Sequence, residues 1–255
     1  PELRELAIAF QGQDMLKEPI HISATAHYSM GGIPTNINCQ VRKNPRELVE
    51  GFYAAGECSC VSVHGANRLG ANSVLEALLF GRHAGENMVK ALDEGIELRK
   101  ASASDADRML AEMNKLKTSG GNETVPGLRN ELQVGMTADA GVFRTKESLE
   151  RQIALIDELL ERFNNIRIDD KSDTFNTDLQ EAIELGHMLE FSKFIVVGAL
   201  NREESRGGHY REDFPTRNDE KFLKHTYAYM DKDFNITQEW GDVVLGKFEP
   251  KERTY

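Results

Sequence analysis

Apolar residues recur at helical spacing through the second half of the chain. Between residues 145 and 163 they lie four, three, four and three positions apart: Leu149, Ile153, Ile156, Leu160 and Phe163. This spacing places them on one face of an amphipathic helix. Thr145 stands just before the first turn, where a hydroxyl side chain caps free backbone N–H groups. We therefore expect a long helix that begins directly after Thr145.

Three further segments have the same character. Helices are expected over Ser102–Lys117 and over Val125–Ala140, where Pro126 occupies an early helical position. Another helix is expected to start at Asn176 and to run through apolar residues to Leu200. Apolar stripes of this kind form the core of helical bundles. The four segments therefore predict a three- or four-helix bundle, and no chemistry is assigned to it.

Short strands are expected in the first hundred residues. Pro19–Ala26 alternates between polar and apolar positions, and Ile37–Arg42 has strand character. A polar hairpin turn is expected at Lys43–Leu48, followed by a buried strand at Phe52–Ala55. These assignments place a strand directly before the most polar loop of this region.

That loop is rich in glycine. Between Val63 and Ser73 it carries polar side chains around Gly65 and Gly70: His64, Asn67, Arg68, Asn72 and Ser73. Glycine allows a backbone to approach a ligand closely, and polar groups gathered in a loop are typical of binding sites. The loop is therefore the first candidate for function.

A helix is expected after the loop. Asn72 and Ser73 are both good capping residues, and the helix is expected to end between Leu92 and Gly95. Its apolar face is expected to contain Leu75, Leu78 and Leu79. Because a helix N-terminus presents free N–H groups and a positive dipole end, this helix favours an anion in the loop.

The last part of the chain is more polar. Glu203–Asp219 is dense in arginine and acidic residues, a composition typical of a solvated or ion-paired structural segment. Short strands are expected at Thr226–Met230, Ile236–Trp240 and Val243–Leu245. These strands predict a small β-containing tail.

Composition narrows the class of protein. The chain has 255 residues, 40% hydrophobic and 29% charged, with a net charge of −11. That charge disfavours a nucleic-acid surface, which needs a basic footprint. No apolar run approaches the ~20 residues of a membrane-spanning helix. Three cysteines are too few for a disulfide framework, so a reducing compartment is expected.

Four kinds of chemistry were compared. Cys58, Cys60 and His64 lack a fourth nearby ligand for a metal site, so no metal is expected. The chain contains no G-x-S-x-G nucleophile motif, and no G-x-G-x-x-G or Walker A sequence of a complete nucleotide fold. Dicarboxylate recognition is the remaining option, because Arg68 offers a bidentate fork and His27 can donate a hydrogen bond.

Two motifs also carry a family resemblance. GECSCVSVHGANRLGANS resembles the FAD- and dicarboxylate-binding loop of the fumarate reductase and succinate dehydrogenase flavoprotein subunits. TAHYSMGGIPT resembles the substrate-histidine segment of that family, although the family usually has prolines where this chain has His21 and Ala24. IRIDDKSDTFNTDLQEAIELGH is similar to the fumarate reductase branch. The whole chain resembles the C-terminal portion of the subunit.

The resemblance implies a fold. It predicts the C-terminal part of an α/β FAD-binding domain, followed by an α-helical bundle and a small C-terminal β-containing tail. The implied boundaries are 1–25 for the end of a capping domain, 26–100 for the FAD-binding part, 101–200 for the bundle and 201–255 for the last domain.

The resemblance also implies roles for individual residues. His27 and Arg68 would hold the substrate carboxylates and polarise the alkene of fumarate, and Arg68 would also adjoin the cofactor. Glu57 would bind the ribose hydroxyls of FAD. Four residues would lie around the isoalloxazine ring, largely through backbone groups: Tyr28, Ala71, Ser73 and Val74.

Partners and location follow from the same resemblance. FAD is expected to be attached covalently to a histidine upstream of Pro1. An iron–sulfur subunit is the expected direct partner and membrane anchor subunits are indirect ones, at the cytoplasmic face of the inner membrane. The parent protein would transfer hydride between FAD and fumarate or succinate. As a separate polypeptide the chain is expected to be inactive.

Two alternatives remain open at this point. L-aspartate oxidase shares a similar HGANR loop, whereas adenylylsulfate reductase is a more distant relative. A different class of function is a non-enzymatic docking module that uses the helical bundle as its surface. Bound flavin distinguishes the two classes, because an enzyme of this family carries it and a docking module does not.

Overall fold

The computed structural model describes residues 2–22, 25–97, 100, 102–247 and 249–251. Its helices are α1 (Glu2–Gln11), α2 (Asn72–Asp93), α3 (Ala103–Thr118), α4 (Val125–Asp139), α5 (Lys146–Phe163), α6 (Thr177–Asn201) and α7 (Asp219–Phe222). Its strands are β1 (Ile33–Pro34), β2 (Gln40–Arg42), β3 (Leu48–Tyr53), β4 (Ser59–Cys60), β5 (Glu123–Thr124), β6 (Ile166–Arg167), β7 (Lys224–Met230) and β8 (Ile236–Asp242).

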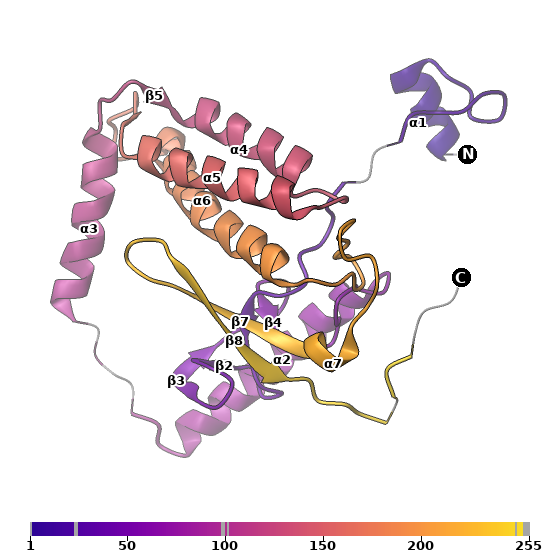
Figure 1. Ribbon diagram of the computed structural model, residues 1–255. Coiled ribbons are helices and arrows are strands. Elements are labelled where there is room, and N and C mark those ends of the chain that lie inside the picture. The colour runs from indigo at the N-terminus through magenta and orange to yellow at the C-terminus, as the bar shows by residue number, and fades with distance from the viewer. Residues whose placement is uncertain (1, 23–24, 98–99, 101, 248, 252–255) are drawn as a thin grey trace.

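The main core is a bundle of three helices, α4, α5 and α6, that lie side by side (Figure 1). The predicted stripe of α5 faces this core, where Leu149 and Ile156 are fully buried against Leu185 and Leu189 of α6. The predicted cap is also present, since the Thr145 hydroxyl accepts from Ser148 N at 3.2 Å and Ser148 Oγ accepts from Thr145 N at 3.1 Å. This reciprocal capping fixes where α5 begins.

Helix α3 forms as expected but is not a full member of the bundle. None of its residues is buried, and Met109 and Leu110 are more than half exposed. Only Leu116, near its C-terminal end, packs against the bundle core. In Figure 1, α3 stands beside the bundle, so its apolar side is largely open among the described residues.

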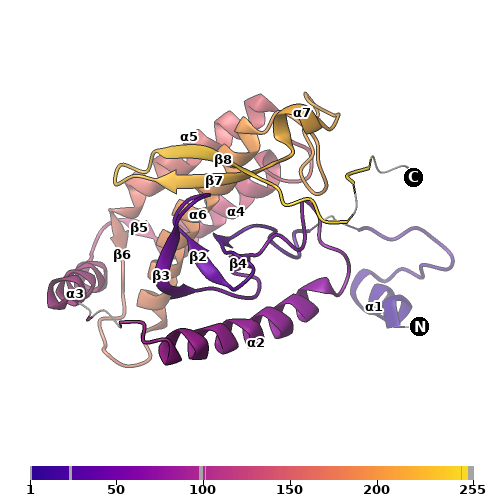
Figure 2. The same ribbon diagram turned by 90° about the horizontal axis from the view of Figure 1, so that it is seen from below.

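The short strands of the first hundred residues lie between α2 and the β7–β8 hairpin (Figure 2). β2 pairs with β3 in an antiparallel hairpin, as the polar turn predicted, and β1 pairs with β4 in parallel. The strand expected at Pro19–Ala26 is wrong: residues 19–22, 25 and 26 are not in a strand, and residues 23 and 24 lie outside the described residues. The Gln11 side chain holds the His21 backbone instead, through His21 N at 3.2 Å and His21 O at 3.1 Å.

The buried strand expected at Phe52–Ala55 also needs correction. β3 ends at Tyr53, and the Phe52 side chain is 51% exposed. The reason is the size of the sheet, because β3 pairs only with β2 among the described residues. A two-stranded ribbon without a covering layer leaves side chains in water.

Helix α2 starts and ends where expected, but its cap and its buried face differ from the prediction. The N-cap residue is Ala71, at φ +64°, and neither Asn72 nor Ser73 caps the helix with its side chain. Leu75, Leu78 and Leu79 are each more than half exposed. The buried positions are Glu76, Phe80 and Ala84, four residues apart, because this face meets Cys39 and its apolar neighbours.

The arginine-rich segment after α6 is ion-paired, as predicted, and two of its charged residues, Glu204 and Arg211, are buried. Glu204 is fully buried and accepts from Arg202 at 2.8 Å and from Arg206 at 2.7 Å. Arg211, 1% exposed, donates to the carbonyl oxygens of Ala199 and Leu200, each at 2.9 Å. Arg211 therefore satisfies carbonyl groups of the last turn of α6, where a cation is favoured.

The C-terminal strands are confirmed except for the last. β7 and β8 pair in an antiparallel hairpin whose outermost pair is Lys224 with Asp242. Val243–Leu245 is not a strand, because β7 begins at Lys224 and offers no partner beyond it. The secondary structure is thus helical with small sheets, four two-stranded sheets among the described residues.

A turn of this C-terminal region contacts the glycine-rich loop. Gly208 N donates to Ala66 O at 2.8 Å. Gly207 adopts φ +60°, and a Cβ there would lie 2.3 Å from Ala66 O. The turn itself is held by His209, whose Nδ1 lies 3.0 Å from Arg144 Nη1 and whose Nε2 lies 3.1 Å from Arg202 O.

We predict that Gly207→Ala destabilises the protein by about 3 kcal/mol. The added Cβ would overlap with the Ala66 carbonyl oxygen, and alanine also has to adopt a positive φ.

Two other glycines serve as matched controls. Gly65→Ala meets the same positive φ with open space around it, so it should cost about 1 kcal/mol. Gly208→Ala meets only the flexible Met30 side chain closely and should be near neutral. Urea unfolding measures the free energy of unfolding of the three variants. Equal losses of stability in Gly207→Ala and Gly65→Ala would contradict the predicted order.

We also predict a pH dependence from His209. Burial, and then the neighbouring charges of Arg144, Arg202 and Arg211, lower its pKa in the folded protein. Because the unfolded histidine has a pKa of about 6.5, the unfolded state binds more protons as the pH falls below that value. Stability is therefore retained above pH 6.5 and lost below it.

The measurement is urea unfolding at pH 7.5 and pH 5.5 for the wild type and for His209→Gln, whose amide can accept from Arg144 and donate to Arg202 O. Between pH 7.5 and pH 5.5, the free energy of unfolding of the wild type should fall by about 1 kcal/mol more than that of the variant. An equal loss in both proteins would show that His209 does not contribute to the acid sensitivity.

Candidate functional site

The glycine-rich loop joins β4 to α2 and carries most of the predicted site. Gly65 and Ala71 both have positive φ, +59° and +64°, one at the start of the HGANR sequence and one directly before α2. At its middle, Ala66 is fixed by the C-terminal turn described above. The loop is thus held in one conformation by residues far away in the sequence.

A buried cluster of polar groups lies between the loop, α2 and the segment that carries His27. Tyr28 donates its hydroxyl to Glu76 Oε2 at 2.8 Å, and His64 Nε2 lies 2.8 Å from the same oxygen. The Tyr28 hydroxyl and His64 Nε2 are 3.2 Å apart, and the two rings meet edge to face. Asn72 Nδ2 approaches His64 Nδ1 at 3.5 Å. Two separate segments therefore converge on one carboxylate of α2.

Arg68 lies against this cluster. Its guanidinium carbon is 4.9 Å from the centre of the Tyr28 ring, a cation–π arrangement. Nη1 donates to Leu69 O at 3.2 Å, whereas Nε is buried and has no hydrogen-bond partner among the described residues. Because arginine carries five donors in a rigid fork, the side chain keeps donors for an anionic ligand.

His27 and Glu57 are less constrained. His27 is exposed and makes no hydrogen bond or ion pair with another described residue. Glu57 is also exposed, and its Oε1 lies at a long 3.4 Å from Ser29 N. The structure therefore brings Tyr28 and Arg68 into contact, and it leaves the side chains of His27 and Glu57 open to solvent.

Ala71, Ser73 and Val74 stand at the start of α2. Ala71 has no side chain that can cap the helix, and the first turn contains no acidic residue. Val74 is 64% exposed. The first turn of α2 thus carries no acidic side chain that would offset the positive end of the helix dipole, which makes it a favourable place for negative charge.

The electrostatic environment keeps Tyr28 protonated. Burial, followed by the hydrogen bond and charge of Glu76, raises the pKa of Tyr28 to about 12. The hydroxyl therefore remains a donor to Glu76 at neutral pH. Burial likewise raises the pKa of the Cys60 thiol, which disfavours a reactive thiolate there.

Sequence reasoning missed Glu76. It stands 3% exposed on the face of α2 that also buries Phe80 and Ala84. The spacing of four residues was visible in the sequence, but the apolar leucines nearby suggested another face. His64 was noted as a polar loop residue, and no role was assigned to it.

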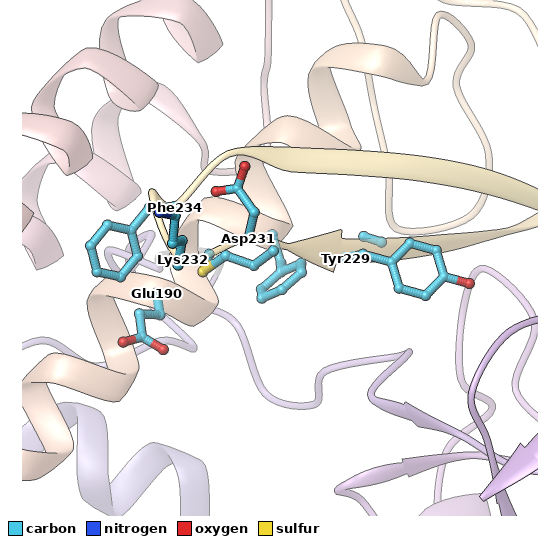
Figure 3. Close-up of a pocket in the computed structure, with 8 residues that line it drawn as sticks. Glu190, Tyr229, Asp231, Lys232 and Phe234 are labelled. Carbon is cyan, nitrogen blue, oxygen red and sulfur yellow. The ribbon is translucent and has the colours of Figure 1, made fainter.

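A hollow of the surface lies elsewhere, between α6 and the turn of the β7–β8 hairpin (Figure 3). Its lining includes Glu190, Tyr229, Lys232 and Phe234, and none of the predicted site residues. Asp231 at its edge is engaged with Asn235 in the hairpin turn. No described group of three or more His, Cys, Asp or Glu side chains is placed to hold a metal ion. No helix among the described residues is long and apolar enough to span a membrane.

Two family models match the chain. The model described as "Fumarate reductase flavoprotein C-term" matches residues 129–255, and an FAD binding domain model matches residues 1–74. The two matches cover the helical core with the C-terminal hairpin, and the segments that carry His27 and the loop.

Individual relatives agree with the family models. The chain is 41% identical to a fumarate reductase flavoprotein subunit of Serratia, over 100% of this chain and 42% of the relative. It is 39% identical to a succinate dehydrogenase flavoprotein subunit of Rickettsia bellii, over 96% of this chain and 42% of the relative.

A solved structure of E. coli quinol fumarate reductase superposes with a TM-score of 0.88 at 41% identity, over 99% of this chain and 43% of that one. The chain thus spans about two fifths of the length of the relatives it matches. Sequence identity and fold agree along nearly all of its residues. The chain belongs to the family of fumarate reductase and succinate dehydrogenase flavoprotein subunits.

Proposed function

We propose that this chain supplies the C-terminal half of the dicarboxylate and FAD site of a flavoprotein that interconverts fumarate and succinate. The observation that carries the proposal is Arg68, whose guanidinium lies over the Tyr28 ring while its Nε is buried with no hydrogen-bond partner in the part of the chain that the structure describes. A buried donor without a partner is costly, and a substrate carboxylate offers two acceptor oxygens to such a fork.

Arg68 and His27 would then hold the two carboxylates of the substrate. Arg68 comes from the loop and His27 from the segment next to it, so the two donors approach a ligand from different parts of the chain. Cationic and hydrogen-bond donors that bind both ends of fumarate also withdraw electron density from its alkene, which favours hydride acceptance.

The residues around the start of α2 fit FAD. FAD supplies the hydride donor or acceptor of the reaction when it is bound. The N-terminus of α2 would stabilise negative charge on the reduced ring, near Ala71, Ser73 and Val74. The exposed carboxylate of Glu57 is suited to accept hydrogen bonds from ribose hydroxyls. Tyr28 would adjoin the ring, with its hydroxyl turned toward Glu76.

The finer assignment is the fumarate reductase branch, with an iron–sulfur subunit as direct partner and membrane anchor subunits as indirect ones. The support is the similarity of residues 166–187 to that branch and the fumarate reductase name of several relatives. A peripheral position at the cytoplasmic face of the inner membrane belongs to the same proposal. An L-aspartate oxidase is not favoured, since the relatives are fumarate reductase and succinate dehydrogenase subunits.

We predict that Arg68→Lys lowers fumarate turnover by about a hundredfold while FAD content is unchanged. Lysine keeps the charge but loses the bidentate fork and the planar stack on Tyr28. The measurement is fumarate reduction by a reduced viologen dye, together with flavin absorbance of the same FAD-loaded preparation.

The matched control is Arg82→Lys, because Arg82 lies on α2, is exposed and, among the described residues, forms an ion pair with Glu86 alone, at 2.8 Å. That variant should behave as the wild type. Loss of FAD or of the fold in Arg68→Lys would make Arg68 structural, and unchanged turnover would exclude it as a substrate ligand.

We also predict that flavin absorbance stays with the polypeptide after acid precipitation of the holoenzyme. Covalent attachment to a histidine outside this chain would prevent release, whereas noncovalent FAD remains in the supernatant. Absorbance in the supernatant would refute covalent attachment, and a preparation without any flavin would favour the docking-module alternative.

A further inference from the structure

The two donors proposed to bind substrate lie on separate segments. His27 precedes Tyr28 on the irregular chain before β1, and Arg68 lies on the loop before α2. Neither segment belongs to a long helix or a large sheet. The pairing of β1 with β4 brings the two segments side by side through backbone hydrogen bonds, such as Ile33 N to Cys58 O at 2.9 Å. Because a binding site requires its donors in a fixed relation, side chains must set the relation of His27 to Arg68 beyond these strands.

Glu76 makes that connection. A single carboxylate oxygen, Oε2, lies 2.8 Å from the Tyr28 hydroxyl and 2.8 Å from His64 Nε2. Tyr28 is next to His27, and His64 opens the HGANR sequence. Glu76 itself is 3% exposed on α2, the longest helix of this half of the chain. The helix therefore anchors both flexible segments through one atom.

The hydrogen-bond pattern orients the His64 ring. The Tyr28 hydroxyl donates to Glu76 Oε2, and His64 Nε2 lies against the same oxygen. On the other side of the ring, His64 Nδ1 faces the Asn72 amide, 3.5 Å away. The His64 ring is thus oriented from both sides, a common way to fix an imidazole.

The cluster also determines the place of Arg68. Its guanidinium rests 4.9 Å above the Tyr28 ring, and that ring is held through the hydroxyl bonded to Glu76. A movement of Tyr28 would remove the surface on which Arg68 lies. A side chain that orients a binding group in this way acts without touching the substrate.

We propose that Glu76 is a positioning residue that joins the His27–Tyr28 segment to the Arg68 loop and so sets the geometry of the dicarboxylate site. The proposal rests on the proposed function for its activity readout. It also makes a structural claim that does not depend on the substrate, because loss of the Glu76 carboxylate should loosen residues 61–72 whatever they bind.

The test compares Glu76→Ala and Glu76→Gln in the FAD-loaded holoenzyme. Glu76→Ala should raise the KM for fumarate and the Kd for malonate, an unreactive dicarboxylate, by about ten- to a hundredfold, the usual cost of removing a group that orients a binding side chain. FAD content should be unchanged. Glu76→Gln retains one acceptor oxygen but replaces the other with an amide donor, so it should weaken binding by a smaller factor than Glu76→Ala does.

Hydrogen exchange provides the second readout. Amides of residues 61–72 should exchange faster in Glu76→Ala than in the wild type, without any ligand present. The matched control is Glu86→Gln, which removes an exposed carboxylate from the same helix and should leave exchange, KM and Kd unchanged. Wild-type exchange and wild-type affinity in Glu76→Ala would overturn the proposal.

A third variant decides the case in which Glu76→Ala fails to fold. Tyr28→Phe keeps the ring beneath Arg68 and removes only the hydroxyl held by Glu76. Tyr28→Phe and Glu76→Gln should each raise the Kd for malonate. The Kd of the double variant should be no higher than that of the single variant with the higher Kd. Additive effects would overturn the proposal.

The outcomes separate this proposal from the proposed function. A wild-type holoenzyme that neither reduces fumarate nor binds malonate refutes the function. In that protein, faster exchange of residues 61–72 in Glu76→Ala would still support the link between the two segments. An active wild type whose exchange and affinity are insensitive to Glu76 refutes the positioning role alone.

Discussion

The buried carboxylate of Glu76 is the constraint on which the candidate site depends. A charge withdrawn from water must be surrounded by donors, and here the donors come from two segments that have little regular structure of their own. The hydroxyl of Tyr28 and the imidazole of His64 both hydrogen-bond to the Glu76 carboxylate, and these bonds connect their two segments. A buried carboxylate requires hydrogen-bond donors, and here that requirement also holds the loop around Arg68 in place.

A similar solution recurs at the C-terminal side of the bundle. Glu204 is fully buried among arginine donors, and Arg211 satisfies the last carbonyl groups of α6. This ion-paired segment contains the turn whose Gly208 N donates to Ala66 O of the loop. The bundle therefore supports the loop from one side through charged groups, and α2 supports it from the other.

Local signals in the sequence predicted the parts that depend on local interactions. Thr145, Asn176 and the spacing of the α5 leucines correctly predicted helix starts and the buried face, because caps and helical periodicity act within one element. The predicted face of α2 was wrong, since what covers a helix depends on distant residues such as Cys39. The loop was recognised by its residue types and by family resemblance, whereas Glu76 became visible only once its partners were placed.

The contact between Gly207 and Ala66 has a consequence for the order of folding. Residues far apart in sequence meet late, because a long loop must be closed before their contact forms. During synthesis, the HGANR loop and α2 leave the ribosome well before the turn at Gly207 and Gly208 exists. Tyr28, His64 and Glu76 can meet earlier, since all three precede residue 77 and 48 residues separate Tyr28 from Glu76. The loop therefore acquires its anchor on α2 first, and its second support is added only when the C-terminal segment docks.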